Sequence, residues 1–169
     1  MAGVPRGPST TTPLDATGDE AVVEAIVRAS RAIMGIAVQS LSEVSDEVTL
    51  AQYRTLVVLA LEGPRRLADL AEALEVSPST TTRMCDRLEA KALIERTRDE
   101  LDRREVNLGL TDAGQKLVDT VMDRRREGVR LLLQLVPGHS RPALVESLTV
   151  LTQAAAEMPQ FHWAPGWSP

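Results

Sequence analysis

The stretch 67–111 constrains the fold of this 169-residue chain most, because its pattern predicts two short helices followed by a hairpin. Apolar residues spaced i, i+3, i+4 and i+7 mark the first helix: Leu67, Leu70, Ala71 and Leu74. This spacing lays one apolar stripe along the segment. Ser77-Pro78 then predicts a new helix start, since serine accepts a hydrogen bond from an unpaired amide and proline suits the first helical position. Two helices therefore meet across a tight turn.

The helix that follows Ser77 has two different faces when its residues are placed about 100° apart. The predicted core face consists of Thr81, Met84, Cys85 and Leu88. The residues predicted to contact DNA lie at the helix start or on the other face: Ser77, Ser79, Thr80, Thr82, Arg83, Asp86 and Arg87. Hydroxyls and guanidiniums near a helix N-terminus suit phosphate oxygens and base edges in a major groove. A merely solvated face would carry the same residues, so this helix alone does not decide its role.

The segment after the second helix favours DNA binding. Two runs, 93–98 and 105–110, predict strands on either side of the tip 99–104, and the second run alternates apolar and other residues. A tip with so many charges cannot belong to a core. Thr111 then predicts the cap of another helix. Two helices and a hairpin in this order predict a winged helix-turn-helix.

These residues resemble the MarR-type transcriptional regulators. The motifs that carry the resemblance are LADLAEAL at 67–74, VSPSTTTRMCDRLEAKALIER at 76–96, DRR at 102–104 and LTDAG at 110–114, in the family's order and spacing. The resemblance covers roughly residues 20–158 and is sharp between 67 and 114. Glu75 and Ala92 depart from it, since the family usually places glycine at these helix ends, and both turns are expected to be strained or differently shaped.

The rest of the chain predicts further helices around this motif. Apolar residues keep helical spacing from 20 to 44, a capping box at 49–52 begins a second helix that is apolar nearly all round, and Gly63-Pro64 ends that helix. Helices at 112–135 and 140–158 follow the hairpin. The expected domains are a tail at 1–19, a dimerisation helix at 20–48, the winged helix-turn-helix at 49–111, dimerisation helices at 112–158 and a tail at 159–169. The fold class is mainly α with a small β-hairpin wing.

The helices at the two chain ends bring more apolar surface than a winged-helix unit of roughly 60 residues can cover. In the resembled family, such helices interlock into a twofold dimer, and a twofold protein matches a palindromic operator in double-stranded DNA. An intramolecular bundle on a monomer is the alternative. The aromatic residues of the tail 159–169 either stay irregular or pack over the dimer surface.

The charge pattern predicts only a modest electrostatic attraction to DNA. The chain has a net charge of -5, which taken alone argues against a nucleic-acid binder. Between 77 and 110, however, basic and acidic residues are equal in number: Arg83, Arg87, Lys91, Arg96, Arg98, Arg103 and Arg104 against Asp86, Glu89, Glu95, Asp99, Glu100, Asp102 and Glu105. Arg65 and Arg66 add positive charge just before the motif. We therefore expect weak non-specific binding to DNA.

The composition argues against several other kinds of site. A single cysteine excludes an intramolecular disulfide, and no CxxC motif or histidine cluster indicates a metal or another cofactor. Residues 1–19 have no apolar run of signal-peptide length, and no later stretch approaches a membrane span, so we expect a cytoplasmic protein. Cys85 shares the apolar face of its helix, where a thiol usually acts as a small hydrophobe rather than a redox sensor.

The sequence bears on three functions from different classes. The resemblance implies a dimeric DNA-binding repressor of adjacent genes that a small effector relieves. A winged helix that only binds other proteins is the alternative, but it leaves the polar face and the basic hairpin tip unexplained. An enzyme is not expected, because His139 and His162 lie in a loop and a tail, without a nucleophile, a metal set or a phosphate-binding loop.

Two further roles follow from the resemblance. Tyr53 falls in the region that, in the family, borders a cleft for small, often aromatic and anionic, effectors, although core packing is the favoured role for its side chain. At the hairpin tip, Asp102-Arg103-Arg104 matches the family's Asp-x-Arg element. Asp102 is expected to orient Arg104 toward the minor groove, and Arg103 is expected to meet phosphate.

Overall fold

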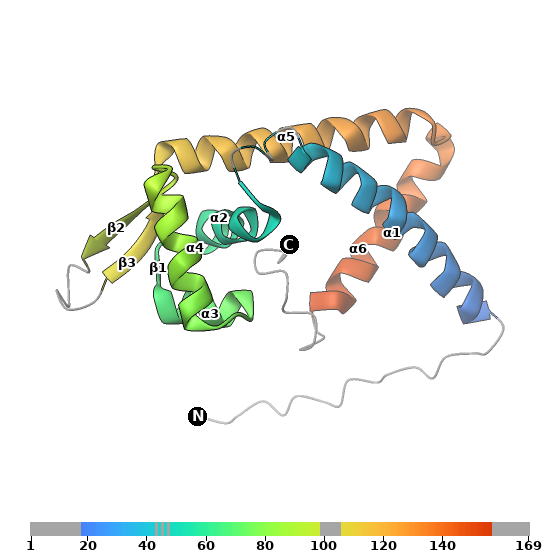
Figure 1. Ribbon diagram of the computed structural model, residues 1–169. Helices are drawn as coiled ribbons and strands as arrows, with labels where there is room; N and C mark the ends of the chain where they lie inside the picture. The colour runs from blue at the N-terminus through green and yellow to red at the C-terminus, as the bar shows by residue number, and fades with distance from the viewer. Residues whose placement is uncertain (1–17, 43, 45, 47, 99–105, 157–169) are drawn as a thin grey trace, which may run out of the picture. The chain divides into compact units, whose positions relative to one another are not determined.

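The computed structural model describes residues 18–42, 44, 46, 48–98 and 106–156. Its elements in chain order are α1 (Gly18–Ser42), α2 (Leu50–Glu62), β1 (Arg65–Arg66), α3 (Leu67–Leu74), α4 (Pro78–Ala90), β2 (Ile94–Arg98), β3 (Val106–Leu110), α5 (Asp112–Gln134), the 3-10 helix η1 (Gly138–Ser140) and α6 (Arg141–Ala156) (Figure 1). The chain divides into two compact units at a boundary inside α1, after Gly35. The mainly helical fold with a small sheet confirms the predicted fold class.

Helix α2 lies in the middle of the core, as its nearly all-round apolar sequence predicted. Thr49 accepts a hydrogen bond from the Gln52 amide at 3.3 Å, and the Gln52 side chain accepts one from the Thr49 amide at 3.0 Å. This reciprocal pair is the predicted capping box. The side chains of Leu56, Val58 and Leu59 are buried. Gly63 ends the helix with a φ of 76°, a conformation that glycine adopts without strain.

The sheet has three antiparallel strands in the order β1-β3-β2. Strands β2 and β3 form the predicted hairpin, with Arg96 opposite Leu108 in the register. Strand β1 was not predicted; it is two residues long and pairs with β3 on the side away from β2. Strand β2 is thus an edge of the sheet, and β3 is its centre.

One apolar core joins α2, α3, α4, the hairpin and the first half of α5. Its fully buried side chains include Leu56, Leu70, Leu88, Leu108 and Val121. The start of α5 lies close to the hairpin because residue 114 has no side chain. A Cβ at Gly114 would lie 2.0 Å from the carbonyl oxygen of Leu93. Thr111 caps α5 by accepting a hydrogen bond from the Gly114 amide at 3.1 Å, as predicted.

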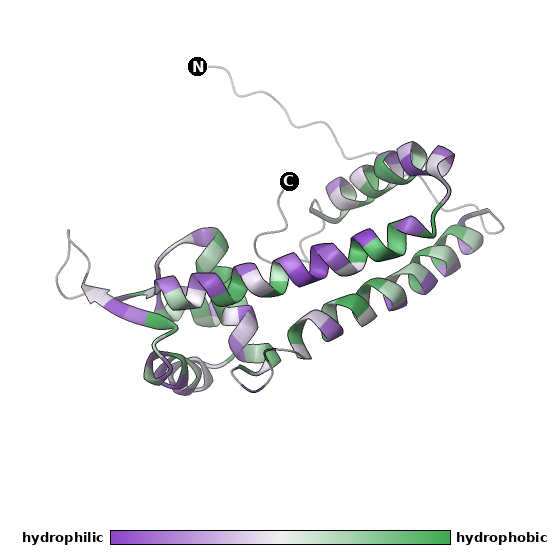
Figure 2. Ribbon diagram, turned by 90° about the horizontal axis from the view of Figure 1, so that it is seen from above, coloured by the Kyte–Doolittle hydropathy of each residue, from purple (hydrophilic) through white to green (hydrophobic). Residues whose placement is uncertain are grey.

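The end helices bury little of their apolar surface. Along α5, no described residue after Val121 is buried, and α6 has no buried residue between 141 and 155. Ser40 is the buried residue of α1. Figure 2 shows hydrophobic residues recurring along α1 and α6. The large apolar residues exposed on these two helices are Val22, Val23, Ile26, Val27, Ile33, Met34 and Val38, with Leu144, Val145, Leu148, Val150 and Leu151.

Candidate nucleic-acid interface

The start of α4 gathers three hydroxyl groups around one helix cap. Ser77 accepts a hydrogen bond from the Thr80 amide at 3.3 Å, as predicted for a capping serine. Its hydroxyl also lies 3.1 Å from the Ser79 hydroxyl and 2.9 Å from the Thr80 hydroxyl. All three side chains are exposed. Because helix amides and their dipole also favour anions here, this end of α4 suits a phosphate oxygen.

The two predicted faces of α4 are observed. The face predicted to be core is buried: Thr81, Met84, Cys85 and Leu88. On the opposite face Arg83 and Arg87 are exposed, and neither is held by an ion pair to another described residue. Thr82 is half-buried, and its hydroxyl donates a hydrogen bond to the Pro78 carbonyl at 2.8 Å. The exposed face of α4 therefore offers two guanidiniums beside its hydroxyl-rich start.

Tight turns precede and follow α4, and each contains one residue whose backbone is in the left-handed conformation. At the end of α3, Glu75 has a φ of 56°, the Glu75 amide donates to the Glu72 carbonyl and the Val76 amide to the Ala71 carbonyl. At the end of α4, Ala92 has a φ of 56°, and the amides of Ala92 and Leu93 donate to carbonyls in the same pattern. These bonds form Schellman motifs, which usually have glycine at the left-handed position. Both turns therefore have the usual Schellman shape, so of the two expected outcomes the structure favours strain at Glu75 and Ala92 over a different shape.

Asp86, one of the residues predicted to contact DNA, forms an ion pair. Its Oδ1 lies 2.6 Å from Nη2 of Arg96 on β2, and Nη1 of Arg96 lies 3.4 Å from Oε2 of Glu89. The hydrogen bond to Asp86 raises the pKa of Arg96 above its ordinary value. From its sequence position, Arg96 was expected only to contribute one of the basic charges between 77 and 110. A helix-to-strand ion pair depends on how α4 packs on the hairpin, which no spacing in the sequence encodes.

The wing-tip residues Asp102, Arg103 and Arg104 lie outside the described residues.

At the β1 edge of the sheet, Arg65 is paired with Glu62 at 2.7 Å and Arg66 with Asp69 at 3.0 Å. These arginines were noted in the sequence as positive charge just before the motif. Their ion pairs reduce the net charge that they add to this part of the surface.

Cys85 and Tyr53 both lie in the core, as favoured from the sequence. The Cys85 side chain has no exposed surface, and burial raises the pKa of its thiol to about 11. Tyr53 is 4% exposed, and its hydroxyl has no hydrogen-bond partner among the described residues. Burial raises the pKa of Tyr53, while the positive charge of Arg125 acts in the opposite direction. The Nε of Arg125 is likewise buried without a described partner.

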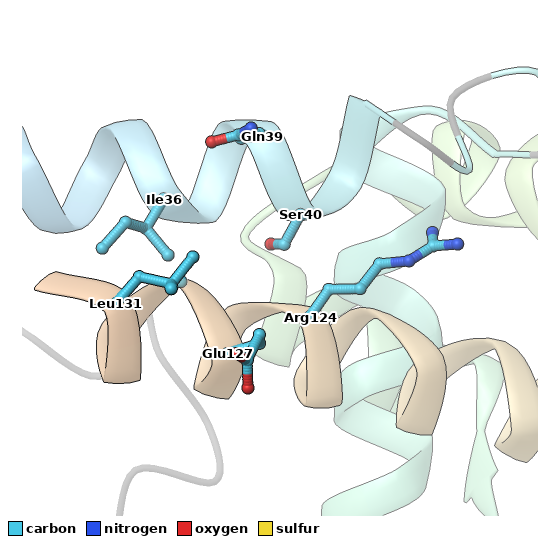
Figure 3. A pocket seen from close by; sticks show the side chains of 7 residues that line it. Ile36, Gln39, Ser40, Arg124, Glu127 and Leu131 are labelled. Atoms are coloured by element: carbon cyan, nitrogen blue, oxygen red, sulfur yellow. The ribbon is translucent and has the colours of Figure 1, made fainter.

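A pocket of about 210 Å³ lies between the last turns of α1 and the middle of α5 (Figure 3). Its lining residues are Ile36, Gln39, Ser40, Arg124, Glu127, Gly128 and Leu131. Ile36 and Leu131 lie at one end of the pocket, and Ser40 and Arg124 lie at the other. Tyr53 does not line it. The pocket therefore combines an apolar end with a polar one, as a small amphipathic molecule would need.

Neither a metal-binding cluster nor a membrane-spanning helix occurs in the described part of the chain. Residues 18–98 and 106–156, apart from 43, 45 and 47, contain no group of three histidine, cysteine or acidic side chains placed to hold a metal ion. Over the same residues, no helix is both long enough and apolar enough to cross a membrane.

Known proteins resemble this chain in sequence and in structure. The sequence profile of the MarR family matches residues 48–106. The HTH-type transcriptional repressor MdtR of Bacillus subtilis is 43% identical over 79 residues, or 47% of this chain and 51% of MdtR. The match thus spans about half the length of that relative.

Two solved structures extend the likeness beyond the matched segment. The crystal structure of RV1404 from Mycobacterium tuberculosis has a TM-score of 0.73 and 35% identity, and the match covers 85% of this chain and 98% of RV1404. The S. aureus MepR–DNA complex has a TM-score of 0.60 and 27% identity, and the match covers 75% of this chain and 94% of the MepR chain. Nearly the whole of each of these chains therefore has a counterpart here.

Proposed function

The chain belongs to the MarR family of transcriptional regulators, and on that premise we propose that it is a homodimeric repressor that binds a palindromic operator and is released by a small effector. Its family and its named relatives are regulators, not enzymes, which agrees with the prediction that the chain is not an enzyme. The relative MdtR is named a repressor, which supports repression rather than activation. Because its target is DNA, we place its action in the cytoplasm.

The observation that carries the proposal is the exposed face of α4. Its buried face packs into the core, so the opposite face, with Arg83 and Arg87, is held outward by the same packing. A helix presented in this way enters the major groove in helix-turn-helix proteins. We assign base contacts to Arg83, since it lies in the second turn, and phosphate contacts to the hydroxyls of Ser77, Ser79 and Thr80. The MepR–DNA complex supports this assignment by its similar fold.

Homodimerisation is proposed from the end helices. Large apolar residues are exposed along both α1 and α6. Exposed apolar helix faces of this kind mark association surfaces in soluble proteins. A second copy of the chain is the proposed occupant, because twofold assembly duplicates α4 and so reads two half-sites. Binding to two half-sites at once compensates for the weak electrostatic attraction expected from the neutral segment 77–110.

The wing is proposed to contact the minor groove through residues 102–104. In this arrangement Asp102 orients Arg104, which enters the groove beside α4, and Arg103 meets phosphate. Arg104→Ala is then expected to weaken operator binding strongly and to flatten the preference for A·T-rich flanks. Arg103→Ala is expected to weaken binding more uniformly and to reduce mainly its salt dependence.

An anionic, often aromatic, effector is proposed as the signal that releases DNA. Supporting this, the Tyr53 hydroxyl and the Arg125 Nε are both buried without a described hydrogen-bond partner. Buried polar atoms without partners are costly, so a bound carboxylate or phenol that pairs with them would be favoured. Such a ligand lowers DNA affinity only if it prefers the dimer shape that fits DNA less well.

The proposed function is tested by binding to the DNA upstream of the protein's own gene. A footprint of that region would first identify the bound sequence, called here the operator duplex. Fluorescence anisotropy would then compare the affinity for the operator duplex with the affinity for a scrambled duplex at 0.15 M salt. We expect Arg83→Ala to cost about 1 to 3 kcal/mol per half-site on the operator duplex and little on the scrambled one. Equal wild-type affinity for both duplexes would favour the protein-interaction scaffold instead. Titrating phenolic carboxylates into the complex tests the effector.

A further inference from the structure

The guanidinium of Arg96 joins the wing to α4. Its Nη2 donates to Oδ1 of Asp86 at 2.6 Å, and its Nη1 lies 3.4 Å from Oε2 of Glu89. Asp86 and Glu89 are three residues apart on α4, so their carboxylates lie on the same side of the helix. One planar cation on β2 thus bridges two anions on the neighbouring helix, a geometry that suits the arginine fork.

We propose that Arg96, Asp86 and Glu89 form a clamp that fixes the direction of the β2–β3 hairpin relative to α4. The proposal rests on the DNA-binding function proposed above. It assigns Asp86 the role of a positioning residue rather than a base contact, which revises its place in the set predicted from the sequence. The recognition helix and the wing then meet DNA as one unit.

The position of β2 explains why such a clamp is needed. Strand β2 is an edge strand that pairs with β3, and its first residue, Ile94, is buried in the core. From residue 95 to residue 97 its side chains are exposed, so the strand leaves the core after Ile94 (Figure 1). Arg96 acts two residues farther along, about 7 Å from that anchor. An ion pair at this distance resists rotation of the hairpin about its base.

The charges of the clamp also need an explanation. Asp86 and Glu89 are acidic residues on the helix proposed to lie against phosphates, where Coulomb repulsion opposes binding. All three clamp side chains are partly exposed, at 39% for Arg96, 54% for Asp86 and 39% for Glu89. Exposed ion pairs contribute little to folding stability. Holding the hairpin in its bound direction instead reduces the entropy lost on binding DNA, which gives these acids a function.

Two predictions of opposite sign separate the clamp from simple electrostatics. Asp86→Asn removes a negative charge, so Coulomb reasoning predicts tighter binding to any duplex. The clamp predicts about 5-fold weaker binding to the operator duplex, with binding to the scrambled duplex unchanged or tighter. Glu95→Gln is the matched control, since Glu95 is an exposed acid on β2 outside the clamp. If Asp86→Asn tightened operator binding as Glu95→Gln does, the clamp would be overturned.

A double-mutant cycle separates the clamp from a direct base contact by Asp86. If Asp86 acts through Arg96, its loss does not weaken operator binding further once Arg96 is replaced by glutamine, because the pair is already broken. Asp86→Asn in the Arg96→Gln background is then expected to leave operator affinity within 2-fold. A further 5-fold loss in that background would show that Asp86 contacts the base itself, and would overturn its assignment as a positioning residue.

Hydrogen exchange on the DNA-free protein tests the clamp apart from the proposed function. Both Asp86→Asn and Arg96→Gln are expected to speed amide exchange in β2 and β3 several-fold, with exchange in α2 and α3 unchanged. Unchanged exchange in the hairpin would overturn the clamp even if the protein binds its operator. Faster exchange with no wild-type preference for operator DNA would instead sustain the clamp and reject the proposed function.

Discussion

The winged-helix region and the end helices have the same apolar periodicity but very different burial. In the winged-helix region, the apolar stripes of α3 and α4 meet inside the chain, and Leu70 and Leu88 have no exposed surface. In α1, the large apolar residues between Val22 and Met34 are exposed, from 40% at Ile26 to 61% at Met34. Periodicity therefore determines which face of a helix is apolar. It does not determine whether the partner of that face lies in the same chain.

Because of this difference in burial, the two regions gain their stability in different ways. Burying a large aliphatic side chain contributes about 1.5 to 3 kcal/mol, so the winged-helix core gains its stability within one chain. The end helices can gain the same contribution only by association, which makes their stability dependent on protein concentration. Substitutions that act on packing should therefore affect folding in the first region and assembly in the second.

The largest expected effect comes from adding one methyl group in the winged-helix core. A Cβ at Gly114 would lie 2.0 Å from the Leu93 carbonyl oxygen, a backbone atom that cannot move without displacing the hairpin. Gly114→Ala is expected to lower the free energy of unfolding by at least about 3 kcal/mol, measured by urea denaturation. Gly138→Ala is the control, since nothing lies within 4 Å of its added Cβ. Equal stability of the two variants would contradict the close packing at Gly114.

The next effect in size tests the end helices. Ile26→Glu and Leu148→Glu place a charge on exposed apolar faces of α1 and α6, so they should leave folding intact and prevent assembly. Light scattering at micromolar protein is expected to give the monomer mass, and operator affinity should fall at least about 100-fold, since one half-site remains. Leu61→Glu, an exposed leucine at the end of α2, is the matched control. A wild-type chain that is monomeric at all concentrations would reject the dimer.

The sequence predicted the winged helix well because its signals are local. Ser77 and Thr111 cap helices by accepting hydrogen bonds from amides three positions away, Pro78 occupies the first helical position, and the alternating strands pair within one hairpin. Strand β1 carries no such signal, because two residues show no periodicity and its pairing with β3 is set by tertiary packing. The ion pair of Asp86 with Arg96 was missed for the same reason. The Glu75 and Ala92 turns were predicted from the glycines that the resembled family usually has there.

A third prediction concerns how the free energy of unfolding of the winged-helix core depends on pH. The buried Cys85 thiol has a pKa of about 11 when folded, against 9.0 for the unperturbed group. Between these values the unfolded thiol loses its proton while the folded one keeps it, so unfolding becomes easier as pH rises. The stability contribution is thus fully present below pH 9 and is lost as pH rises toward 11, by about 2 kcal/mol.

The control for this pH dependence is the Cys85→Ala variant. Its absolute stability will be lower because of the cavity, so the slope against pH between 9 and 11 is the quantity to compare. The raised pKa of Tyr53 acts in the same direction and remains in the variant. A shallower slope in Cys85→Ala is expected. Identical slopes would mean that the thiol ionises as easily in the folded protein as in the unfolded chain.

The smallest expected effect concerns backbone strain, which is also unevenly distributed. Both non-glycine residues with positive φ in the described part of the chain, Glu75 and Ala92, lie in the winged-helix region, where packing can hold them. A side chain at a φ of 56° costs about 1 to 2 kcal/mol, whereas glycine has no such cost but loses more entropy on folding. Ala92→Gly should therefore stabilise the protein by about 0.5 to 1 kcal/mol, with the hydrogen bonds of the turn unchanged.

Ala90→Gly, two residues earlier and still inside α4, should destabilise it by about the same amount, because glycine weakens a helix. Opposite signs from the same substitution, measured by thermal unfolding, would show that the core, not the local sequence, sets this turn. Destabilisation by both would mean that Ala92 is unstrained.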